Sequence, residues 1–596
     1  MKKTFLLSCL MLAAMPVMAA YTGHVYVDKN KNGVFDQSEK PLAGIKVSDG
    51  LNVVETAADG SFTLPGHERE RFIFITTPSG YKTFNRHYHK IEKKQSGYDF
   101  GLIPYSGRIR KDGSHRYIHI TDTEIFNTEN HADWVNNVRD YARNEQAAFI
   151  IHTGDICYEK GLKAHIKLMN TENMDCPVFY CIGNHDLVKG KYGEELFESI
   201  YGPVYYSFDA GNVHYVVTPM SGGDHAPGYT SDDVCRWLKN DLAHIRPGTP
   251  VVVFNHDLLT YEDTFIFKSK NAGSINLNEY NLKAWVYGHW HINYMKKQGD
   301  VYSVCTSSLD KGGIDHSTTA FRVMHVDSKG DFTSELRYTY LDKNICIASP
   351  AGVMASGVLP VAVNVYSSVS PVREVLYTCL ADGKPVLKNK RLLQSTDWSW
   401  NGELPLSHKY VGKELTLRVT ARFNNGEIAE AESNFICRTE KAVPLFSADW
   451  DNLSGNAKHS APVSAPLNLP LQLAWTNNVG ANLYMTSPLI HKGKVIVASV
   501  DEDLKGAGHV YALNGKDGTI LWSCPVRNSI KNSIAVDSDI VFAQDAQGFL
   551  YAIDTETGKL CWEKQLPVNG LPALIDGLVA GEGVVYAGTG KGLCAF

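Results

Sequence analysis

The middle of the chain alternates short apolar runs with amphipathic stretches. Runs such as "YIHIT" and "AAFIIHT" are separated by stretches such as "HADWVNNVRDYARNEQ" and "DDVCRWLKNDLA". The apolar runs predict buried strands. The amphipathic stretches, with apolar residues three to four positions apart, predict helices. "VYYSFDAGNVHYVVTP" predicts a hairpin that turns at Gly211-Asn212. We therefore expect an α/β domain over residues 106–345.

Two regions that flank this domain have the short alternating runs typical of β-structure. Residues 21–105 contain "GHVYV", "AGIKVSD", "GSFTLP" and "RFIFITTP", broken by Gly, Asp and Pro. Residues 346–440 contain "LPVAVNVYSS", "REVLYTCL" and "ELTLRVTARF". Such runs predict β-sandwiches. The second region favours an immunoglobulin-like sandwich and carries no recognisable chemistry.

An internal repeat occupies the last part of the chain, from about residue 445 to 596. "VYALNGKDGTILW" begins at Val510, and "LYAIDTETGKLCW" begins 40 residues later at Leu550. A β-repeat of this length predicts propeller blades, and the segment resembles quinoprotein-type β-propellers, with "LQLAWTNNVG" as the entry to the first blade. A closed propeller needs about four to eight blades, whereas this region has room for about three. Either the sequence is a fragment, which we favour, or other chains complete the propeller.

The first twenty residues have the order of a secretory signal. Lys2 and Lys3 precede an apolar run that ends in the small residues Ala19 and Ala20. The run is short for a membrane span, and no later stretch is long and apolar enough to cross a bilayer. We expect an exported protein without a transmembrane segment, in the periplasm or at the cell surface.

Charge and cysteine usage exclude several classes of protein. The 596-residue chain has room for roughly three to five domains at about 100–200 residues each. Its net charge is −6 and charges of both signs are scattered, so no basic stripe for nucleic acid is present. The twelve cysteines form no C-x-x-C pair, which indicates neither a disulfide framework nor a thiolate zinc site. We interpret Cys157 and Cys181 as small buried apolar residues.

A calcium-type loop lies in the first β-region. The segment "DKNKNGVFDQSE" satisfies the spacing D-x-[DN]-x-[DN]-G-x5-E. Oxygens at alternate positions can converge on one ion, and the glycine permits the sharp turn. The segment resembles the calcium loops of bacterial surface modules of the collagen-adhesin B type, and the alternative is a plain turn. We favour a structural calcium ion held by Asp28, Asn30, Asn32, Asp36 and Glu39.

Polar residues that bind metals follow five apolar runs of the α/β domain, at the point where each run ends. One such residue is ordinarily a cap or a solvated turn. The carboxyl ends of strands in an open α/β sheet line one crevice, so five such ends predict a single site. The residues are Asp122 and Glu124, Asp155, Asn184 with His185 and Asp186, His256, and His289 with His291.

These residues resemble the ordered motifs of the calcineurin-like metallophosphoesterases. That family has D-x-H, G-D, G-N-H-[DE], a single His and G-H-x-H in this order, and the chain matches from Asp122 to His291 except at position 124. The resemblance covers about 240 residues and implies a four-layer αββα sandwich. It also implies two divalent metal ions (Mn, Fe, Zn or Mg) and hydrolysis of a phosphomonoester or phosphodiester by a hydroxide that bridges them.

The resemblance also implies a role for each residue. Asp122, Glu124 and His291 would bind the first metal. Asn184, His256 and His289 would bind the second, and Asp155 would bridge both. His185 would contact the phosphoryl oxygen or protonate the leaving group, held in place by Asp186.

The family pattern expects histidine at position 124, where this chain has glutamate. A carboxylate reaches about as far as an imidazole and suits Mn²⁺ or Mg²⁺. We hypothesise that Glu124 remains a ligand, and that its negative charge raises the pKa of water at the site and moves optimal activity to higher pH. The alternative is a degraded first metal site.

Three functions stay open from the sequence. The leading one is a secreted phosphoesterase, and the second is a scaffold or binding protein that acts through its β-domains. A quinone-dependent oxidoreductase is the weakest. The flanking domains could direct the protein to a glycan, lipid or protein at a surface. Of the loop "MSGGDHAPGY", His225 or Tyr229 could touch substrate, and Trp290 could stack on substrate or pack beneath the site.

Overall fold

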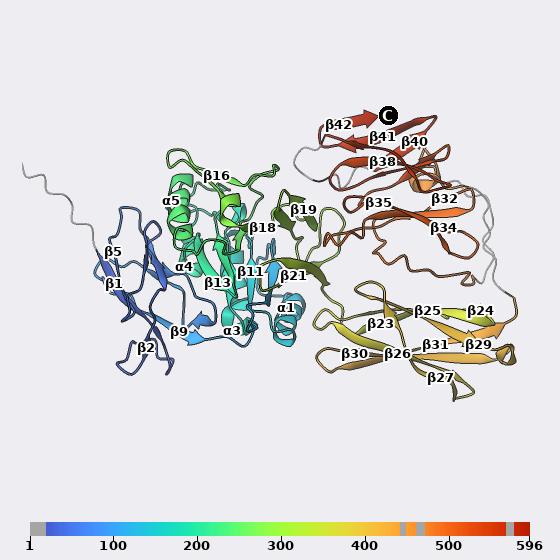
Figure 1. The fold of residues 1–596 in the computed structure, drawn as a ribbon, viewed down its shortest axis with the longest axis horizontal. Helices are drawn as coiled ribbons and strands as arrows, with labels where there is room; N and C mark the ends of the chain where they lie inside the picture. Colours follow the sequence, from blue (N-terminus) through green and yellow to red (C-terminus); the bar gives the residue numbers. More distant parts are fainter. Residues whose placement is uncertain (1–19, 441–448, 461–470, 568–571, 573–576) are drawn as a thin grey trace, which may run out of the picture.

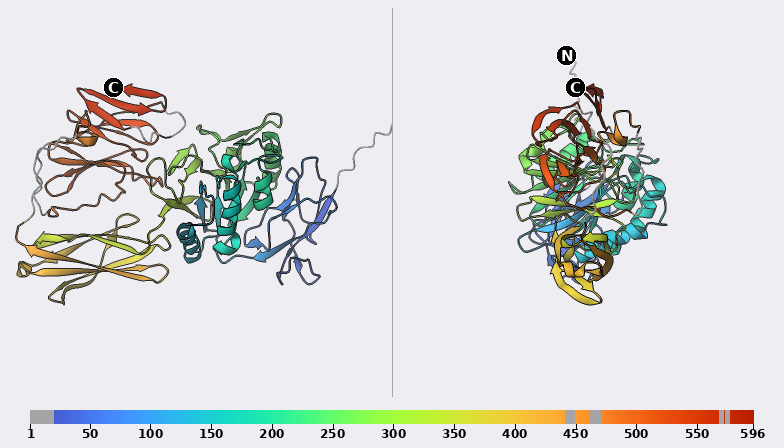
Figure 2. Two further views of the ribbon diagram at one scale, coloured as in Figure 1. Left: turned by 180° about the vertical axis from the view of Figure 1, so that it is seen from behind. Right: turned by 90° about the vertical axis from the view of Figure 1, so that its right-hand side faces the viewer.

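The computed structural model describes residues 20–440, 449–460, 471–567, 572 and 577–596. The expected secretory signal lies outside these residues, except for Ala20. The described chain forms a β-domain, an α/β core, a second β-domain and a C-terminal β-module (Figure 1). Figure 2 shows the first β-domain and the C-terminal module at opposite sides of the core.

The N-terminal domain consists of two small sheets. One has the order β2-β1-β9-β7, with β5 paired to β1, and the other has the order β4-β3-β6-β8. Alternate apolar residues of both sheets enclose a small core around Val25, Val47, Phe62 and Ile73. The strands are β1 (Tyr21–Val27), β2 (Lys40–Pro41), β3 (Lys46–Ser48), β4 (Val53–Glu55), β5 (Ser61–Leu64), β6 (Phe72–Ile75), β7 (Tyr81–Thr83), β8 (Tyr88–Lys90) and β9 (Phe100–Pro104).

The α/β core has two sheets that face each other. The first has the order β12-β11-β10-β21-β22, and the second has the order β13-β14-β15-β18-β20-β19. The first sheet contains β10 (His115–Ile120), β11 (Phe149–His152), β12 (Val178–Tyr180), β21 (Ala320–Val326) and β22 (Phe332–Tyr338). The second contains β13 (Tyr206–Ala210), β14 (Val213–Val217), β15 (Val251–Phe254), β18 (Leu282–Tyr287), β19 (Tyr294–Gln298) and β20 (Val301–Cys305).

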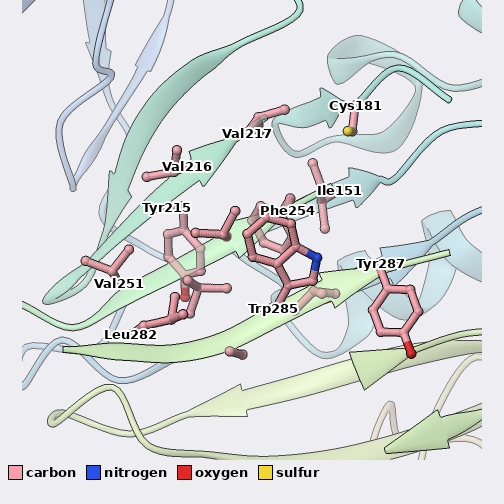
Figure 3. Close-up of a cluster of buried hydrophobic side chains, with 14 of the residues drawn as sticks. Ile151, Cys181, Tyr215, Val216, Val217, Val251, Phe254, Leu282, Trp285 and Tyr287 are labelled. Atoms are coloured by element: carbon pink, nitrogen blue, oxygen red, sulfur yellow. The ribbon is translucent and has the colours of Figure 1, made fainter. Parts of the chain in front are cut away.

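Aromatic side chains fill the space between the two sheets. The rings of Tyr117 and Phe149 in the first sheet stack at 4.7 Å, and Tyr215 and Phe254 of the second sheet pack against them edge-on. Such edge-to-face pairs add to the free energy of burial. Figure 3 shows part of this cluster, including Tyr215, Phe254 and Trp285.

Helices cover the outer faces of both sheets. Residues of α1 (Ala132–Asn144), α2 (Tyr158–Leu168) and α4 (Glu195–Tyr201) pack on the first sheet. α5 (Ser231–Leu242) packs beside the second sheet. The order of helices, sheet, sheet and helix confirms the predicted four-layer core. The remaining short elements are α3 (Thr171–Met174), β16 (Ile266–Lys268), β17 (Ser274–Asn276) and the 3-10 turns η1 (Asn184–Asp186) and η2 (Leu277–Tyr280).

Two sheets form the predicted second sandwich. Their orders are β23-β25-β29-β28 and β24-β31-β30-β26-β27, and their inward side chains form one core. The strands are β23 (Asn344–Ser349), β24 (Gly352–Ala355), β25 (Gly357–Tyr366), β26 (Val372–Ala381), β27 (Lys384–Arg391), β28 (Leu393–Gln394), β29 (Ser399–Leu406), β30 (Glu414–Phe423) and β31 (Ile428–Arg438), with the turn η3 (His408–Tyr410).

The described residues of the C-terminal module form three antiparallel sheets, as expected for propeller blades. They are β32 (Leu489–His491), β33 (Lys494–Ala498), β34 (His509–Asn514) and β35 (Ile520–Pro525); β36 (Ala535–Asp537), β37 (Ile540–Gln544), β38 (Phe549–Asp554) and β39 (Leu560–Gln565); and β40 (Leu578–Gly581), β41 (Val584–Thr589) and β42 (Gly592–Ala595), preceded by the turn η4 (Leu453–Gly455). The module matches the predicted partial propeller.

The repeated tryptophan and glycine explain how one sheet of the module is joined to the next. The Trp522 Nε1 atom donates to the Thr555 carbonyl at 2.9 Å, in the turn of the following sheet. A Cβ atom at Gly558 would lie 2.7 Å from the Trp522 ring. The 40-residue period therefore repeats a contact between sheets as well as a strand pattern.

Candidate metal centre

Strand ends from both sheets of the core bring the predicted residues to one edge. Asp122 and Glu124 follow β10, Asp155 follows β11, and His256 follows β15. β10–β11–β12 run parallel in the first sheet, and β14–β15–β18–β20 run parallel in the second. Their carboxyl ends therefore face the same crevice. Asn184 with His185 and Asp186 follows β12, and His289 with His291 follows β18.

Asp155, His256 and His289 form the centre of this cluster. One potential ligand atom from each lies within 4.8 Å of the other two. The His256 Nε2 atom is 3.0 Å from Asp155 Oδ2 and 4.0 Å from Asp122 Oδ1. These side chains come from different strands of two sheets, so the packing of the sheets sets their spacing.

Asp122 joins this centre to a second group. Its Oδ1 atom is 3.3 Å from the His291 Nε2 atom, which lies 3.6 Å from Glu124 Oε1. Asp122 also accepts a hydrogen bond from the backbone N–H of His289 at 3.0 Å. Asp122, Glu124 and His291 thus lie together at one side of the cluster.

The buried Asn184 Oδ1 atom of the cluster has no hydrogen-bond partner. A buried acceptor without a partner costs about 1–3 kcal/mol. Oxygen and imidazole donors without thiolates suit hard or borderline divalent cations. The donor set of this chain therefore fits the two metal ions that the sequence predicts.

The backbone at the site is strained. Asp122, Glu124, Asp155, His289 and His291 have positive φ values of 50°, 42°, 54°, 64° and 50°. A non-glycine residue in this left-handed region costs on the order of 1–3 kcal/mol, and such residues gather at functional sites. Each strand therefore turns sharply where its polar side chain enters the crevice.

The glycines of the motifs are required because the strand ends touch. A Cβ atom at Gly183 would lie 2.3 Å from the Asp155 backbone nitrogen. A Cβ atom at Gly288 would lie 1.9 Å from Thr121 Oγ1 and 2.6 Å from Asp122 Oδ2. The glycines of the G-N-H and G-H-x-H motifs are thus needed because any larger residue would clash with the neighbouring strand end.

Electrostatics couple Asp155 to His256. Burial lowers the pKa of His256, but the Asp155 charge outweighs burial and raises it to about 10. Burial raises the pKa of Asp155, and His256 lowers it to about 2. Each group thus favours the charged form of the other, and a divalent cation between them would take the place of the imidazolium proton.

His185 is oriented differently from the sequence prediction. Its Nδ1 atom is 2.9 Å from Asp224 Oδ2, not from Asp186. Asp186 is buried and accepts the backbone N–H groups of Cys157 and Gly183, both at 2.9 Å. Its two oxygens thus hold the chain around His185. In this structure Asp224 contacts the His185 ring, and Asp186 contacts the backbone near it.

Asp224 was missed by sequence reasoning. It lies in the loop "MSGGDHAPGY", where only His225 and Tyr229 were singled out. Burial lowers the pKa of His185, but the Asp224 hydrogen bond and nearby carboxylates raise it. The Asp224 N–H also donates to the Asn184 carbonyl at 3.0 Å. The sequence did indicate that this loop, which follows β14, lies near the site, and that was the one sign that Asp224 could contact it.

Lys311 is the second residue that sequence reasoning missed. Its Nζ atom lies 2.6 Å from Glu124 Oε2 and 3.2 Å from the Glu124 carbonyl oxygen. The lysine follows β20, whose carboxyl end opens on the same crevice. Its cation offsets the charge that glutamate brings to position 124.

Several other candidate residues have structural roles. The Tyr229 hydroxyl donates to the Met220 carbonyl and its ring packs in the core, while His225 is exposed. The Trp290 Nε1 atom donates to Asp257 Oδ1 at 3.0 Å, and its ring is buried against Tyr287, which favours packing beneath the site.

The two cysteines near the site are buried, as expected. Burial raises the pKa of both the Cys157 and Cys181 thiols. The cysteines in the described part of the chain are all free.

The calcium-type loop stays a prediction. Asp28 accepts the backbone N–H groups of Asn32 and Gly33 at 3.1 and 2.9 Å. Glu39 accepts from Lys29 at 2.9 Å, and Asn30 donates to Asp36 at 2.7 Å. The carboxylates that would hold a calcium ion therefore accept hydrogen bonds from within their own loop.

Family models match three parts of the chain. Residues 29–104 match the N terminal of calcineurin-like phosphoesterase, and residues 115–293 match calcineurin-like phosphoesterase. Residues 472–596 match outer membrane protein assembly factor BamB. The middle of the chain is thus a calcineurin-like phosphoesterase domain, preceded by the N-terminal domain of that family and followed by a BamB-like propeller region. That family consists of metal-dependent phosphoester hydrolases.

Solved structures resemble parts of the chain, and no curated protein sequence matches it. A quinohemoprotein alcohol dehydrogenase from Pseudomonas putida HK5 is 19% identical over 25% of each chain, with a TM-score of 0.21. BamB from Moraxella catarrhalis is 12% identical over 46% of this chain and 66% of that one, with a TM-score of 0.16. A predicted phosphoesterase from Streptococcus pneumoniae TIGR4 is 10% identical over 38% of this chain and 98% of that one, with a TM-score of 0.18.

The chain spans about a quarter of the length of the quinoprotein dehydrogenases that it matches. In the part of the chain that the structure describes, no helix combines the length and apolar character of a membrane span.

Proposed function

We propose that this protein is an exported phosphoesterase that hydrolyses a phosphomonoester or phosphodiester with two divalent metal ions. The observation that carries the proposal is the joining of the two groups of side chains through Asp122. That carboxylate lies 3.3 Å from His291 and 4.0 Å from His256, so one cluster can hold two adjacent cations.

The proposed ligands divide between the two cations. Asp122, Glu124 and His291 hold the first, and Asn184, His256 and His289 hold the second, with Asp155 between them. When bound, such a pair of cations stabilises charge on the phosphoryl oxygens and activates water. The residues of the chain hold the ions, orient the ester and supply a proton.

His185 is the proposed general acid. Its Nδ1 atom is engaged by Asp224, so Nε2 is the nitrogen that can donate to the leaving-group oxygen. The carboxylates around it raise its pKa, which favours the protonated form that this role needs. Asp224 positions the ring, and Asp186 supports the backbone on either side of it.

The test uses p-nitrophenyl phosphate and its bis-ester with added Mn²⁺. The parent protein should hydrolyse one of them, and His185→Ala should lower kcat by about 10²–10⁴-fold, the usual contribution of a general acid. His244→Ala, at the end of α5 and outside the cluster, is the matched control and should retain activity.

Two results would contradict the proposal. Equal activity in His185→Ala would indicate contamination or another mechanism. A parent protein that binds metal but hydrolyses no phosphoester would favour the scaffold function.

A further inference from the structure

The C-terminal module packs against the core close to the metal centre. Figure 1 shows β19 and β21 at the side of the core that faces the module, and Figure 2 shows the same contact from behind. Asn528 of the module donates to the Met295 carbonyl of β19 at 2.9 Å. Arg322 of β21 pairs with Asp503 of the module at 2.7 Å. Polar and charged groups therefore lie buried in this interface.

Lys531 of the module is also fully enclosed in this interface. Its Nζ atom donates to the Asn293 carbonyl at 2.6 Å, to Asp315 Oδ2 at 2.6 Å and to Glu502 Oε1 at 2.8 Å. The side chains of Lys531 and Asp315 are 0% exposed, and that of Glu502 is 4% exposed. All three hydrogens of the ammonium group are thus used, two of them on residues of the core.

The two core residues belong to the loops that carry the first metal group. Asn293 comes two residues after His291. Asp315 lies in the loop that contains Lys311, the partner of Glu124. The two loops are joined at the Ile314 N–H, which donates to the His291 carbonyl at 2.9 Å. Lys531 therefore binds to both loops.

Burial of the Lys531 ammonium group carries a free-energy cost that depends on how its partners are placed. Removing an ammonium group from water costs several kcal/mol, which is offset only when its partners are closely placed. Without the lysine, Asp315 and Glu502 would face each other as two buried carboxylates, so the loops would have to move apart or take up protons.

We propose that the C-terminal module completes the metal centre and that Lys531 is a positioning residue for the first metal position. The proposal rests on the proposed function only in assigning Asp122, Glu124 and His291 to a metal. The module then does more than recognise a partner, because the loops of His291 and Lys311 take their places only while Lys531 is docked.

The test compares full-length Lys531→Met with Asn528→Ala. Both substitutions remove interface hydrogen bonds from the module, but only Lys531 contacts the two loops. In Lys531→Met we expect one metal position to bind Mn²⁺ at least tenfold more weakly, while the other stays unchanged. Metal content and Mn²⁺ titration measure this directly. Asn528→Ala should bind both ions as the parent does.

Hydrogen exchange gives a second readout that needs neither metal nor turnover. In the metal-free protein, amides in residues 289–293 and 311–317 should exchange at least tenfold faster in Lys531→Met than in Asn528→Ala. Should Lys531→Met fail to fold, Asp315→Asn replaces it, because it weakens the same contact and leaves Lys531 its bonds to Asn293 and Glu502.

The outcomes separate this inference from the proposed function. Parent-like Mn²⁺ binding and parent-like exchange of both loops in the variant would overturn the inference, whatever the activity. A parent protein that hydrolyses no phosphoester but shows the Lys531-dependent changes would overturn the function and support the inference. Faster exchange over the whole interface in both variants would indicate a general docking role and would also overturn it.

Discussion

Position 124 is where the site departs from its family pattern, and a neighbouring lysine alters the effect of that departure on the charge of the site. Glu124 lies 3.6 Å from His291 and is bonded to Lys311 at 2.6 Å. The pair is partly exposed, so it stabilises the fold only modestly. Its importance lies in charge balance, because the lysine offsets the anion that replaces a neutral imidazole.

Glu124→His should therefore shift the acidic limb of the pH–rate profile to lower pH, by roughly one unit. The substitution removes a negative charge and leaves the Lys311 cation unpaired, which favours loss of a proton from water at the site. The profile of kcat/KM against pH measures the shift.

The double variant Glu124→His/Lys311→Met is the control for this change. It restores the net charge of the pair, so its profile should return toward that of the parent. A profile that is the same in parent and single variant would show that charge at position 124 does not control the reaction.

At the scale of elements, a buried ion cluster joins β13, β14 and α5. His214 of β14 lies 2.7 Å from Asp209 and 2.9 Å from Asp241 of α5, which also accepts from Ser207 of β13 at 2.8 Å. Because side chains alternate along a strand, Tyr215 faces the first sheet while His214 faces the helix. Burial lowers the pKa of His214, but Asp241 and Asp209 raise it to about 9.

This pKa predicts how stability depends on pH. The folded value of about 9 exceeds the ordinary value of 6.5, so the charged histidine stabilises the fold fully below pH 6.5 and loses that effect as pH rises through 9. The loss amounts to about 3 kcal/mol. Denaturant unfolding across this range measures it.

His214→Gln is the matched variant for that experiment. It cannot take up a proton, so its stability should be lower than that of the parent near neutral pH and should fall less than that of the parent between pH 6.5 and 9. A parent-like slope in the variant would assign the pH dependence to other groups.

The calcium-type loop is a second element with its own prediction. With the metal centre saturated by Mn²⁺, added Ca²⁺ should raise the melting temperature, because an ion bound at 100 times its Kd stabilises by about 2.7 kcal/mol. Asp28→Asn should abolish the effect, and Asp59→Asn in the same domain should retain it. The same shift in Asp28→Asn would contradict calcium binding at this loop.

At the scale of the whole molecule, ion pairs bind the flanking domains to the core. On the N-terminal side, Arg71 lies 2.7 Å from both Glu194 and Glu198 of the core. Glu194 is fully buried. Burial raises the pKa of Glu198 to about 7 even though Arg71 opposes the shift. The arginine is therefore needed to hold two buried carboxyl groups.

Arg71→Met should destabilise this contact by about 3–5 kcal/mol, since it leaves two buried carboxylates without a cation. Calorimetry should show an earlier or separate transition for the N-terminal domain. The triple variant with Glu194→Gln and Glu198→Gln should recover most of the loss. A single unchanged transition in Arg71→Met would show that other contacts carry the docking.

The sequence by itself determined the α/β class of the core, the β-character of its neighbours and the type of side chain at each strand end. These follow from local patterns: apolar runs, glycine turns and a 40-residue repeat are each readable within one stretch of chain. The motif from Asp122 to His291 carried most of the candidate site, because each member directly follows its own strand.

Only the tertiary structure decided which groups act on these residues. Asp224 at His185, Lys311 at Glu124 and Lys531 at Asn293 are contacts between segments separated by 39 to 238 positions. No local pattern specifies them, since they depend on how two sheets and a separate module pack. The charge and rigidity of the site are therefore properties of the assembled molecule, whereas the types of its candidate ligands can be identified from the sequence.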